Sequence, residues 1–303
     1  MNQSKDILKM QYYAHSILKG NCLQSKDVIY ILERVQKDIF MKEPNILSVN
    51  PPIYVVGGIG GNFDDFLSIF DIGGPLPYSS YLFLGNYTEN NGNSLKTILL
   101  LFIYKYLYKE NFFLVRGINE INLLSKNVDK EERNKIQVVS KKLNYTLDKE
   151  IMHFFNDAES IEIWESIKSV FNVIPIAAIV GQLYFCTDSQ FKVDEKVLSI
   201  EHIRKEERTV QNKGNKLIKD VMKKFLEENK LNFLIIGLNS NMSLNQVSTN
   251  PSLIPVYSSP HTVSSDCFII EINESKISKR IKMQSIKEEK DDIYSIANEL
   301  ILY

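Results

Sequence analysis

The chain is poor in the features that mark a specialised class of protein. Its 303 residues include only three cysteines, Cys22, Cys186 and Cys267, which are widely spaced and odd in number. They have no metal-finger spacing, so we expect buried thiols in a reducing compartment rather than a disulfide framework. The formal net charge is −1. Bulk charge therefore gives no support for a nucleic acid or an anionic membrane as partner.

Long hydrophobic runs are also missing. The most apolar stretch, residues 94–108, contains Lys96 and Lys105, and it is shorter than the roughly 20 apolar residues that span a bilayer. The first ten residues are too polar for a secretory signal. Acidic residues interleave with the lysines of 276–290, which favours a solvated face over an RNA-binding patch. We expect a cytoplasmic or nuclear protein with no membrane partner and no direct nucleic-acid partner.

The chain does contain an alternation of strand-like and helix-like segments. Strand-like runs at 52–58, 79–87 and 111–117 alternate with helix-like runs at 64–72 and 94–108. Repeats of this length predict a parallel or mixed sheet that is covered by helices. Each of these strands ends in a loop that contains glycine. Ligands bind beyond the carboxyl ends of strands in open α/β sheets, so we expect the three loops to converge on one site.

The rest of the chain completes a single domain over residues 1–303. We predict N-terminal helices over 1–45, a core sandwich over 46–275, and a C-terminal strand with a helical tail over 276–303. A charge-rich insertion at about 121–160 reads as solvated rather than core. The other expected elements are two strands around a turn at Gly181–Gln182, a helix at 212–230, and strands at 231–238, 252–259 and 266–272.

The frame around the three loops resembles the serine/threonine phosphoprotein phosphatases, most closely their type-1 catalytic subunit. The resemblance covers roughly residues 16–280, and it is strongest in EPNILSVNPPIYVVGGIGGNFDDFLSIFDIGG, SSYLFLGNYTENNGNSLKTILLL, YKENFFLVRGINE and VFNVIPIAAIVGQLYFC. Family members carry G-D-x-H-G, G-D-x-V-D-R-G and R-G-N-H-E at the three loops. The resemblance implies an α/β fold, the metallophosphoesterase (calcineurin-like) β-sandwich of mixed sheets flanked by helices.

The family's chemistry uses two metal ions that activate a water and hold the phosphoryl oxygens. Its metal ligands, carried over position by position, fall on Gly58, Gly60, Asn86, Ile118, Asp188 and Leu238. Glycine, isoleucine and leucine have no side-chain atom that can ligate a metal. The resemblance therefore implies that the ligand set is broken, and we expect no metal and no other cofactor.

The residues that assist the metals in the family differ here as well. The general-acid histidine falls on Asn119, and the acid that orients it falls on Glu89. The two arginines that grip phosphate fall on Asn90 and Lys213, which lack the bidentate fork of arginine. Two residues do match the family, where they orient the site and brace the fold, namely Arg116 and Glu120.

These substitutions predict a catalytically inactive pseudophosphatase that acts as a protein-binding or structural subunit of a larger assembly. Its partners would be proteins, including short linear motifs of phosphatase regulators. In type-1 phosphatases such motifs add along a sheet edge beside an apolar groove. The matching groove positions are Tyr184, Leu234, Val247, Ile254 and Ile277. An equally good interpretation is that these residues simply pack the sandwich.

Other interpretations stay open. A divergent metal-dependent phosphatase could rebuild a site from the oxygen-bearing side chains of Asn86, Glu89, Asn119 and Asp188. A phosphopeptide-binding module that does not hydrolyse its ligand is a further alternative. The GGIGG loop at 57–61 fits a phosphatase frame better than a nucleotide-binding loop. His261 falls in a loop near the family's substrate groove, where a residual polar role is open.

Overall fold

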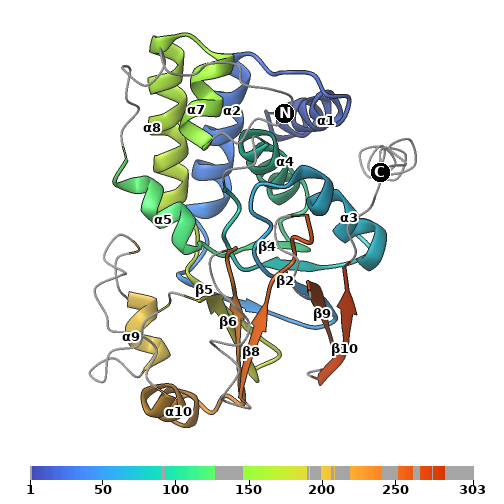
Figure 1. The fold of residues 1–303 in the computed structure, drawn as a ribbon, viewed down its shortest axis with the longest axis vertical. Coiled ribbons are helices and arrows are strands. Elements are labelled where there is room, and N and C mark those ends of the chain that lie inside the picture. Colours follow the sequence, from blue (N-terminus) through green and yellow to red (C-terminus); the bar gives the residue numbers. More distant parts are fainter. Residues whose placement is uncertain are drawn as a thin grey trace.

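The strands form two mixed sheets that share an apolar core (Figure 1). This computed structural model describes residues 2–89, 93–126, 146–189, 191, 199–205, 208, 219–240, 252–261, 267–274 and 276–283. Within them, one five-stranded sheet has the order β1-β5-β6-β7-β8 and the other has the order β10-β9-β2-β3-β4.

The first sheet contains β1 (Ile46–Val49), β5 (Ala177–Val180), β6 (Tyr184–Asp188), β7 (Phe233–Gly237) and β8 (Leu253–Val256). Strands β6, β7 and β8 run parallel, whereas β5 and β6 form an antiparallel hairpin. Gln182 adopts a left-handed φ of 62° in the turn of this hairpin. The parallel strands therefore end together, at Asp188, Gly237 and Val256.

The second sheet contains β2 (Ile53–Val56), β3 (Tyr81–Phe83), β4 (Phe112–Leu114), β9 (Phe268–Asn273) and β10 (Lys276–Lys282). Strands β2, β3 and β4 are parallel, and β9 pairs antiparallel with both β2 and β10. The carboxyl ends of β2, β3 and β4 lead into the three glycine-containing loops. The sheet thus brings these loops to one edge.

Helices cover the sandwich. They are α1 (Asn2–Leu18), α2 (Ser25–Val35) with a π-helical extension η1 (Gln36–Phe40), α3 (Phe63–Gly73), α4 (Ser94–Leu107), α5 (Ile118–Leu124), α7 (Leu147–Phe154), α8 (Asp157–Val173), α9 (Ile200–Lys205) and α10 (Lys219–Glu228). In Figure 1, α1 to α8 lie in the upper part, while α9 and α10 lie at the lower left. Helix α4 is apolar on nearly all sides, as expected for a helix surrounded by core.

The core between the two sheets explains the sequences of the strands, in which apolar residues either alternate with polar ones or fill the whole strand. This core is built from buried side chains of both sheets, among them Val55, Leu82, Ala178, Cys186 and Ile270. The larger helical core lies against the outer faces of the sheets and contains Phe66, Phe70, Phe102, Trp164 and Phe171. Removing this much apolar surface from water is the main favourable contribution to folding.

The insertion expected at 121–160 is only partly as predicted. Residues 127–145 lie outside the described part of the chain. The segment that follows is core rather than solvated, because Leu147 and Ile151 of α7 are 1% and 0% exposed. Helix α7 contacts α4 and α8. The charged residues of α7 led to the prediction of a solvated segment, because the apolar residues occupy only one face of this short helix.

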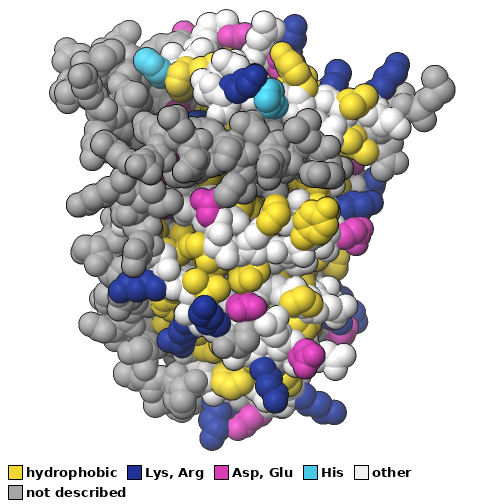
Figure 2. All heavy atoms as spheres, turned by 90° about the vertical axis from the view of Figure 1, so that its right-hand side faces the viewer, with side chains coloured by type: hydrophobic (Ala, Val, Ile, Leu, Met, Phe, Trp, Pro, Cys, Tyr) yellow, Lys and Arg dark blue, Asp and Glu magenta, His cyan; other side chains and the backbone are white. Residues whose placement is uncertain are grey.

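The tail also divides in two. The structure places strand β10, Lys276–Lys282, where the C-terminal strand was expected, whereas the predicted helical tail falls on residues 284–303, outside the described residues. In the described part of the chain, no helix is long and apolar enough to cross a membrane. Figure 2 shows the face that is turned to the right in Figure 1, where basic, acidic and hydrophobic side chains mix rather than separate.

Candidate functional site

The first loop, after β2, is closed by direct contact between main-chain segments. A Cβ atom on Gly58 would lie 2.2 Å from the carbonyl oxygen of Leu238, and one on Gly57 would lie 2.2 Å from that of Val256. Gly58 also forms a β-bridge with Tyr257. The ends of β2, β7 and β8 thus touch where a side chain at position 58 would stand. Only glycine fits this approach.

The second loop is bonded to the first. Asn86, which follows β3, has a left-handed φ of 58°, a conformation that asparagine tolerates better than most residues. Its carbonyl oxygen accepts hydrogen bonds from the main-chain N–H groups of Ile59 and Gly60, at 3.3 and 3.0 Å. Gly60 is left-handed too, with a φ of 56°. The predicted convergence of the loops is therefore observed.

The side chain of Asn86 lies at the centre of a polar cluster that also contains Asp188, Asn119, Glu120 and Glu89. Asn86 is 0% exposed, and its Nδ2 donates to Oδ2 of Asp188 at 2.7 Å. Its Oδ1 accepts from the main-chain N–H of Asn119 at 3.2 Å. Asp188, at the end of β6, is 3% exposed. A buried amide and a buried carboxylate therefore satisfy each other, which removes much of the cost of burying them.

Glu120 braces the same cluster from α5. Its carboxylate is 0% exposed and accepts from the main-chain N–H groups of Asn86, Tyr87 and Gly117 at 2.8–2.9 Å. Burial raises the pKa of this carboxyl above its ordinary value, and the three N–H donors oppose that shift. Glu120 fixes the second and third loops relative to each other.

The side chain of Arg116 forms hydrogen bonds with the helical layer rather than with the polar cluster around Asn86. It is 3% exposed and donates to the carbonyl oxygens of Phe171 and Asn172, both at 3.1 Å, and to that of Arg208. Burial, and then the nearby Arg208, lower the pKa of Arg116 to about 10. Its Nε has no hydrogen-bond partner among the described residues. Arg116 thus ties the end of β4 to the end of α8.

Glu89 and Asn119 lie at the rim, and both are half-buried. The Nδ2 atom of Asn119 donates to the carbonyl oxygen of Thr88 at 2.8 Å and approaches Glu89 Oε1 at 3.5 Å. The same Oε1 accepts from the main-chain N–H of Ser240 at 3.1 Å. Both side chains bond within the rim of the cluster.

The residues present do not fit a pair of metal ions. Gly58 lies against main chain, Leu238 is 1% exposed, and the amide of Asn86 is bonded to Asp188, the one carboxylate among the positions that the resemblance assigns to metal ligands. Ile118 presents only hydrocarbon. In the described part of the chain, no group of three or more histidine, cysteine, aspartate or glutamate residues is arranged to hold a metal ion. Asn90 and Lys213 lie outside the described residues.

The predicted groove positions are largely buried. Tyr184 and Leu234 are each 3% exposed, and Ile254 is 5% exposed. The main-chain N–H of Ile277, which is half-buried, donates to the hydroxyl of Tyr184 at 3.1 Å and so links the two sheets. Val247 lies outside the described residues. This placement agrees with the interpretation that these side chains pack the sandwich, and the groove stays a prediction.

The sequence interpretation missed a buried aspartate close to the first loop. Asp65, in the first turn of α3, is 1% exposed. It accepts from the hydroxyl of Ser259 at 2.5 Å, and its other oxygen is bonded to Nδ1 of His261. Burial raises the pKa of Asp65, and these hydrogen bonds oppose the shift. The bonds tie α3 to the loop after β8. The 196-residue separation between Asp65 and His261 leaves no local sequence signal.

Comparisons with known proteins agree with this architecture. A protein serine/threonine phosphatase from Saccharomyces cerevisiae, with similarity to human phosphatase PP5, matches with a TM-score of 0.69 at 19% identity, over 90% of this chain and 93% of that chain. A cold-active protein-tyrosine phosphatase of a psychrophilic Shewanella matches with a TM-score of 0.52 at 8% identity, over 79% of this chain and 84% of that chain. At such identities the likeness is one of fold.

The fold class predicted from the sequence is confirmed by these matches, whereas closeness to the type-1 subunit stays a prediction. The sequence of residues 51–254 matches the calcineurin-like phosphoesterases. This match covers more than half of the 303 residues, and it includes the ends of the strands that carry the polar cluster. The chain therefore belongs to the calcineurin-like phosphoesterase family.

Proposed function

We propose that this chain is a catalytically inactive pseudophosphatase that works by binding other proteins. The observation that carries the proposal is the hydrogen bond of 2.7 Å between Asn86 and Asp188. These two residues occupy positions that correspond to family metal ligands, and here they bond to each other. Gly58, at a third such position, leaves no room for a side chain. The hydrolytic chemistry of the family needs a set of ligands that act together.

The binding role is supported by what the chain retains. The described part of the chain contains two five-stranded sheets with a shared apolar core. We propose that the partners are proteins, including regulators that carry short linear motifs. Among the described groove positions, only Ile277 has appreciable exposure. Partner contact is therefore expected to extend beyond the buried Tyr184, Leu234 and Ile254.

The proposal is tested by the metal content and the turnover of the purified protein. After incubation with Mn²⁺ and removal of excess ions, we expect substoichiometric metal by mass spectrometry and no turnover of p-nitrophenyl phosphate above that of Asp188→Asn. Stoichiometric metal, with turnover that Asp188→Asn abolishes, would overturn the proposal in favour of a divergent phosphatase. Tight binding of a phosphoserine peptide without hydrolysis would instead indicate a phosphopeptide-binding module.

A further inference from the structure

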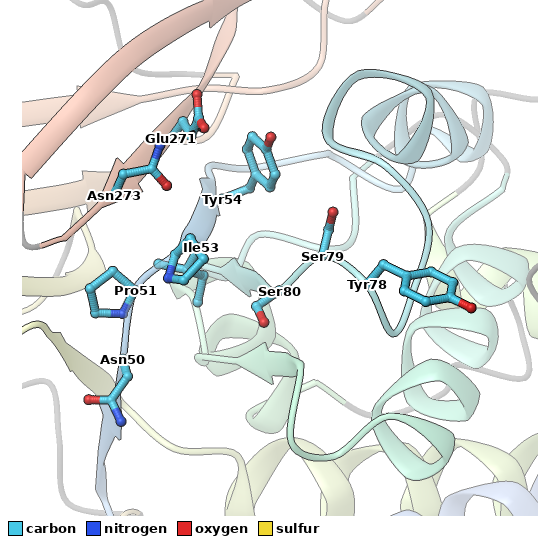
Figure 3. Close-up of a pocket in the computed structure, with 10 residues that line it drawn as sticks. Asn50, Pro51, Ile53, Tyr54, Tyr78, Ser79, Ser80, Glu271 and Asn273 are labelled. Atoms are coloured by element: carbon cyan, nitrogen blue, oxygen red, sulfur yellow. Dashed lines mark hydrogen bonds between the residues drawn. The ribbon is translucent and has the colours of Figure 1, made fainter.

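A cavity of about 300 Å³ lies at the end of the second sheet that is remote from the polar cluster (Figure 3). Its lining comes from residues 50–54 at the start of β2, residues 78–80 before β3, and Glu271 and Asn273 on β9. The volume is at the lower limit of pockets that bind small ligands. It suits one long side chain or a molecule of similar size.

The one charged side chain among the described residues that line the cavity is an acid, which favours a cation as ligand. This acid is Glu271. Glu271 is the cross-strand partner of Tyr54 on β2 and of Lys279 on β10, so a ligand cation would compete with the ammonium group of Lys279 for this carboxylate. The amide of Asn273 donates to Oε1 of Glu271 at 2.8 Å, which fixes the orientation of the carboxylate. A fixed carboxylate is a strong acceptor for an ammonium or guanidinium group.

The aromatic ring of Tyr54 lies beside the carboxylate of Glu271. The ring of Tyr54 stacks on Tyr81 with centroids 5.5 Å apart, and Tyr81 is itself 0% exposed, so the ring of Tyr54 is held in place. Burial, and then the nearby Glu271, raise the pKa of Tyr54. An electron-rich ring next to a carboxylate adds a cation–π contribution.

The lining of the cavity mixes apolar and polar side chains, and part of it is exposed. Pro51 lies on one side, and Tyr78 lies beyond Ser79 and Ser80 on the other side, with its ring directed away from Glu271 (Figure 3). The side chain of Tyr78 is 77% exposed, which is unusual for a large aromatic residue. Lysine and arginine carry aliphatic stems that pack on such surfaces while their charged ends reach a carboxylate.

We propose that this cavity binds the ammonium or guanidinium group of a lysine or arginine side chain that a protein partner presents. The charge of Glu271 determines the sign of the ligand, and the volume accommodates a single side chain. The exposed Tyr78 offers contact to the chain that carries this side chain across the rim. The assignment of a protein as the source rests on the binding half of the proposed function.

The chemistry of the ligand is tested with amino-acid amides. The full-length labelled protein is titrated with N-acetyl-lysine amide and N-acetyl-arginine amide while the NMR signals of the Tyr54 ring and the Asn273 side-chain amide are followed. N-acetyl-norleucine amide has an aliphatic stem without the charge. We expect at least one cationic amide to bind ten-fold more tightly than the norleucine compound. Equal binding of all three would overturn the proposal.

The role of the carboxylate is tested by Glu271→Gln, which keeps an oxygen for the Asn273 amide and removes the charge. Binding of the cationic amides should weaken at least ten-fold. Glu274→Gln is the matched control, because this exposed residue lies in the turn that follows the same strand, and its binding should equal that of the wild type. Unchanged binding by Glu271→Gln would contradict the proposal. If that variant fails to fold, the wild-type lysine–norleucine comparison still decides.

The source of the cation is tested with the peptide Gly-Gly-Arg-Gly-Gly. If a polypeptide crosses the rim, the peptide should bind at least five-fold more tightly than N-acetyl-arginine amide, and Tyr78→Ser should remove that advantage. Equal affinities would overturn the protein partner and indicate a free small amine. These results are independent of metal content and turnover, so failure here leaves the proposed inactivity standing.

Discussion

The missing side chain of Gly58 matters both for the packing of the first loop and for the proposed inactivity. The absence of this side chain allows the main chain of the first loop to touch Leu238, and the contact joins the two sheets at their carboxyl edges. The same position would carry a metal-ligating aspartate in an active relative, by the resemblance of the loops. The loss of stability that a side chain at position 58 would cause can be measured.

We expect Gly58→Ala to lower the free energy of unfolding by about 3 kcal/mol, because its Cβ would lie 2.2 Å from a carbonyl oxygen and the strand ends would have to part. Gly20→Ala is the control, since a Cβ there meets nothing within 4 Å, although its φ is 79°. We expect the control to cost about 1 kcal/mol from backbone strain alone. Urea unfolding measures both. Equal losses would show that the strand ends separate easily and that a ligand side chain could be accommodated.

Single residues also show what sequence reasoning can and cannot reach. The positions of Asn86 and Asp188 followed from the frame of the loops. Their hydrogen bond did not, because 102 residues separate them and only the paired sheets bring them together. The bond between Asp65 and His261 was missed for the same reason. The residue types at strand ends predict which side chains gather at one edge of a sheet. Which of these side chains form hydrogen bonds with each other depends on tertiary packing.

Among elements, long apolar segments were predicted well and short or charged ones poorly. The helix expected at 94–108 is α4, Ser94–Leu107. Strand β1 has only four residues and was missed, because so short a run carries little periodic signal. Helix α8 was missed because acidic residues interrupt its sequence, although Ile163, Ile167 and Val170 lie on one buried face. The π-helical end of α2 has no local sequence rule.

The buried carboxylate of Glu150 joins helices α7 and α4, and the free-energy cost of burying it depends on pH. Oε2 of Glu150 accepts from the main-chain N–H of Leu95 at 3.1 Å, at the start of α4, and Glu150 is 3% exposed. Burial raises the pKa of Glu150 to about 7, and hydrogen bonds from the first turn of α4 oppose the shift. An unfolded glutamate has its ordinary pKa, near 4.5. The folded chain therefore holds this proton more tightly than the unfolded chain.

We expect the contribution of Glu150 to stability to be fully present below about pH 4.5 and to be lost as the pH rises through about 7. The raised pKa corresponds to about 3 kcal/mol across this range. Glu150→Gln cannot titrate, so its free energy of unfolding relative to the wild type should rise by about this amount over the same range.

Denaturant unfolding of wild type and variant at several pH values checks this expectation. Glu162→Gln, on the exposed face of α8, is the matched control, and its difference from the wild type should not change with pH. A pH-independent difference for Glu150→Gln as well would mean that the carboxylate is ionised throughout the range and acts as an ordinary helix cap.

The molecule as a whole is expected to be stable without metal. In a centre built from clustered carboxylates, bound ions compensate the charge, and their removal would leave that charge buried and unpaired. Here the cluster around Asn86 is bonded within itself. We therefore expect the thermal midpoint to be the same in EDTA and in excess Mn²⁺. A ligand that binds only the folded state raises the midpoint, so a rise with Mn²⁺ that Asp188→Asn abolishes would revive a rebuilt metal site.

The hydrogen bond between Asn86 and Asp188 also affects how this sequence can change over generations. Aspartate at position 86 alone would place two carboxylates at hydrogen-bonding distance in a buried site, where both cannot be ionised cheaply. Aspartate at position 58 alone would displace Leu238. By the resemblance of the loops, each of these two first steps towards a metal-binding set is expected to lower stability, and any benefit would require several ligands together. Selection that acts on one substitution at a time would then have to pass through less stable intermediates before the chain could bind a metal.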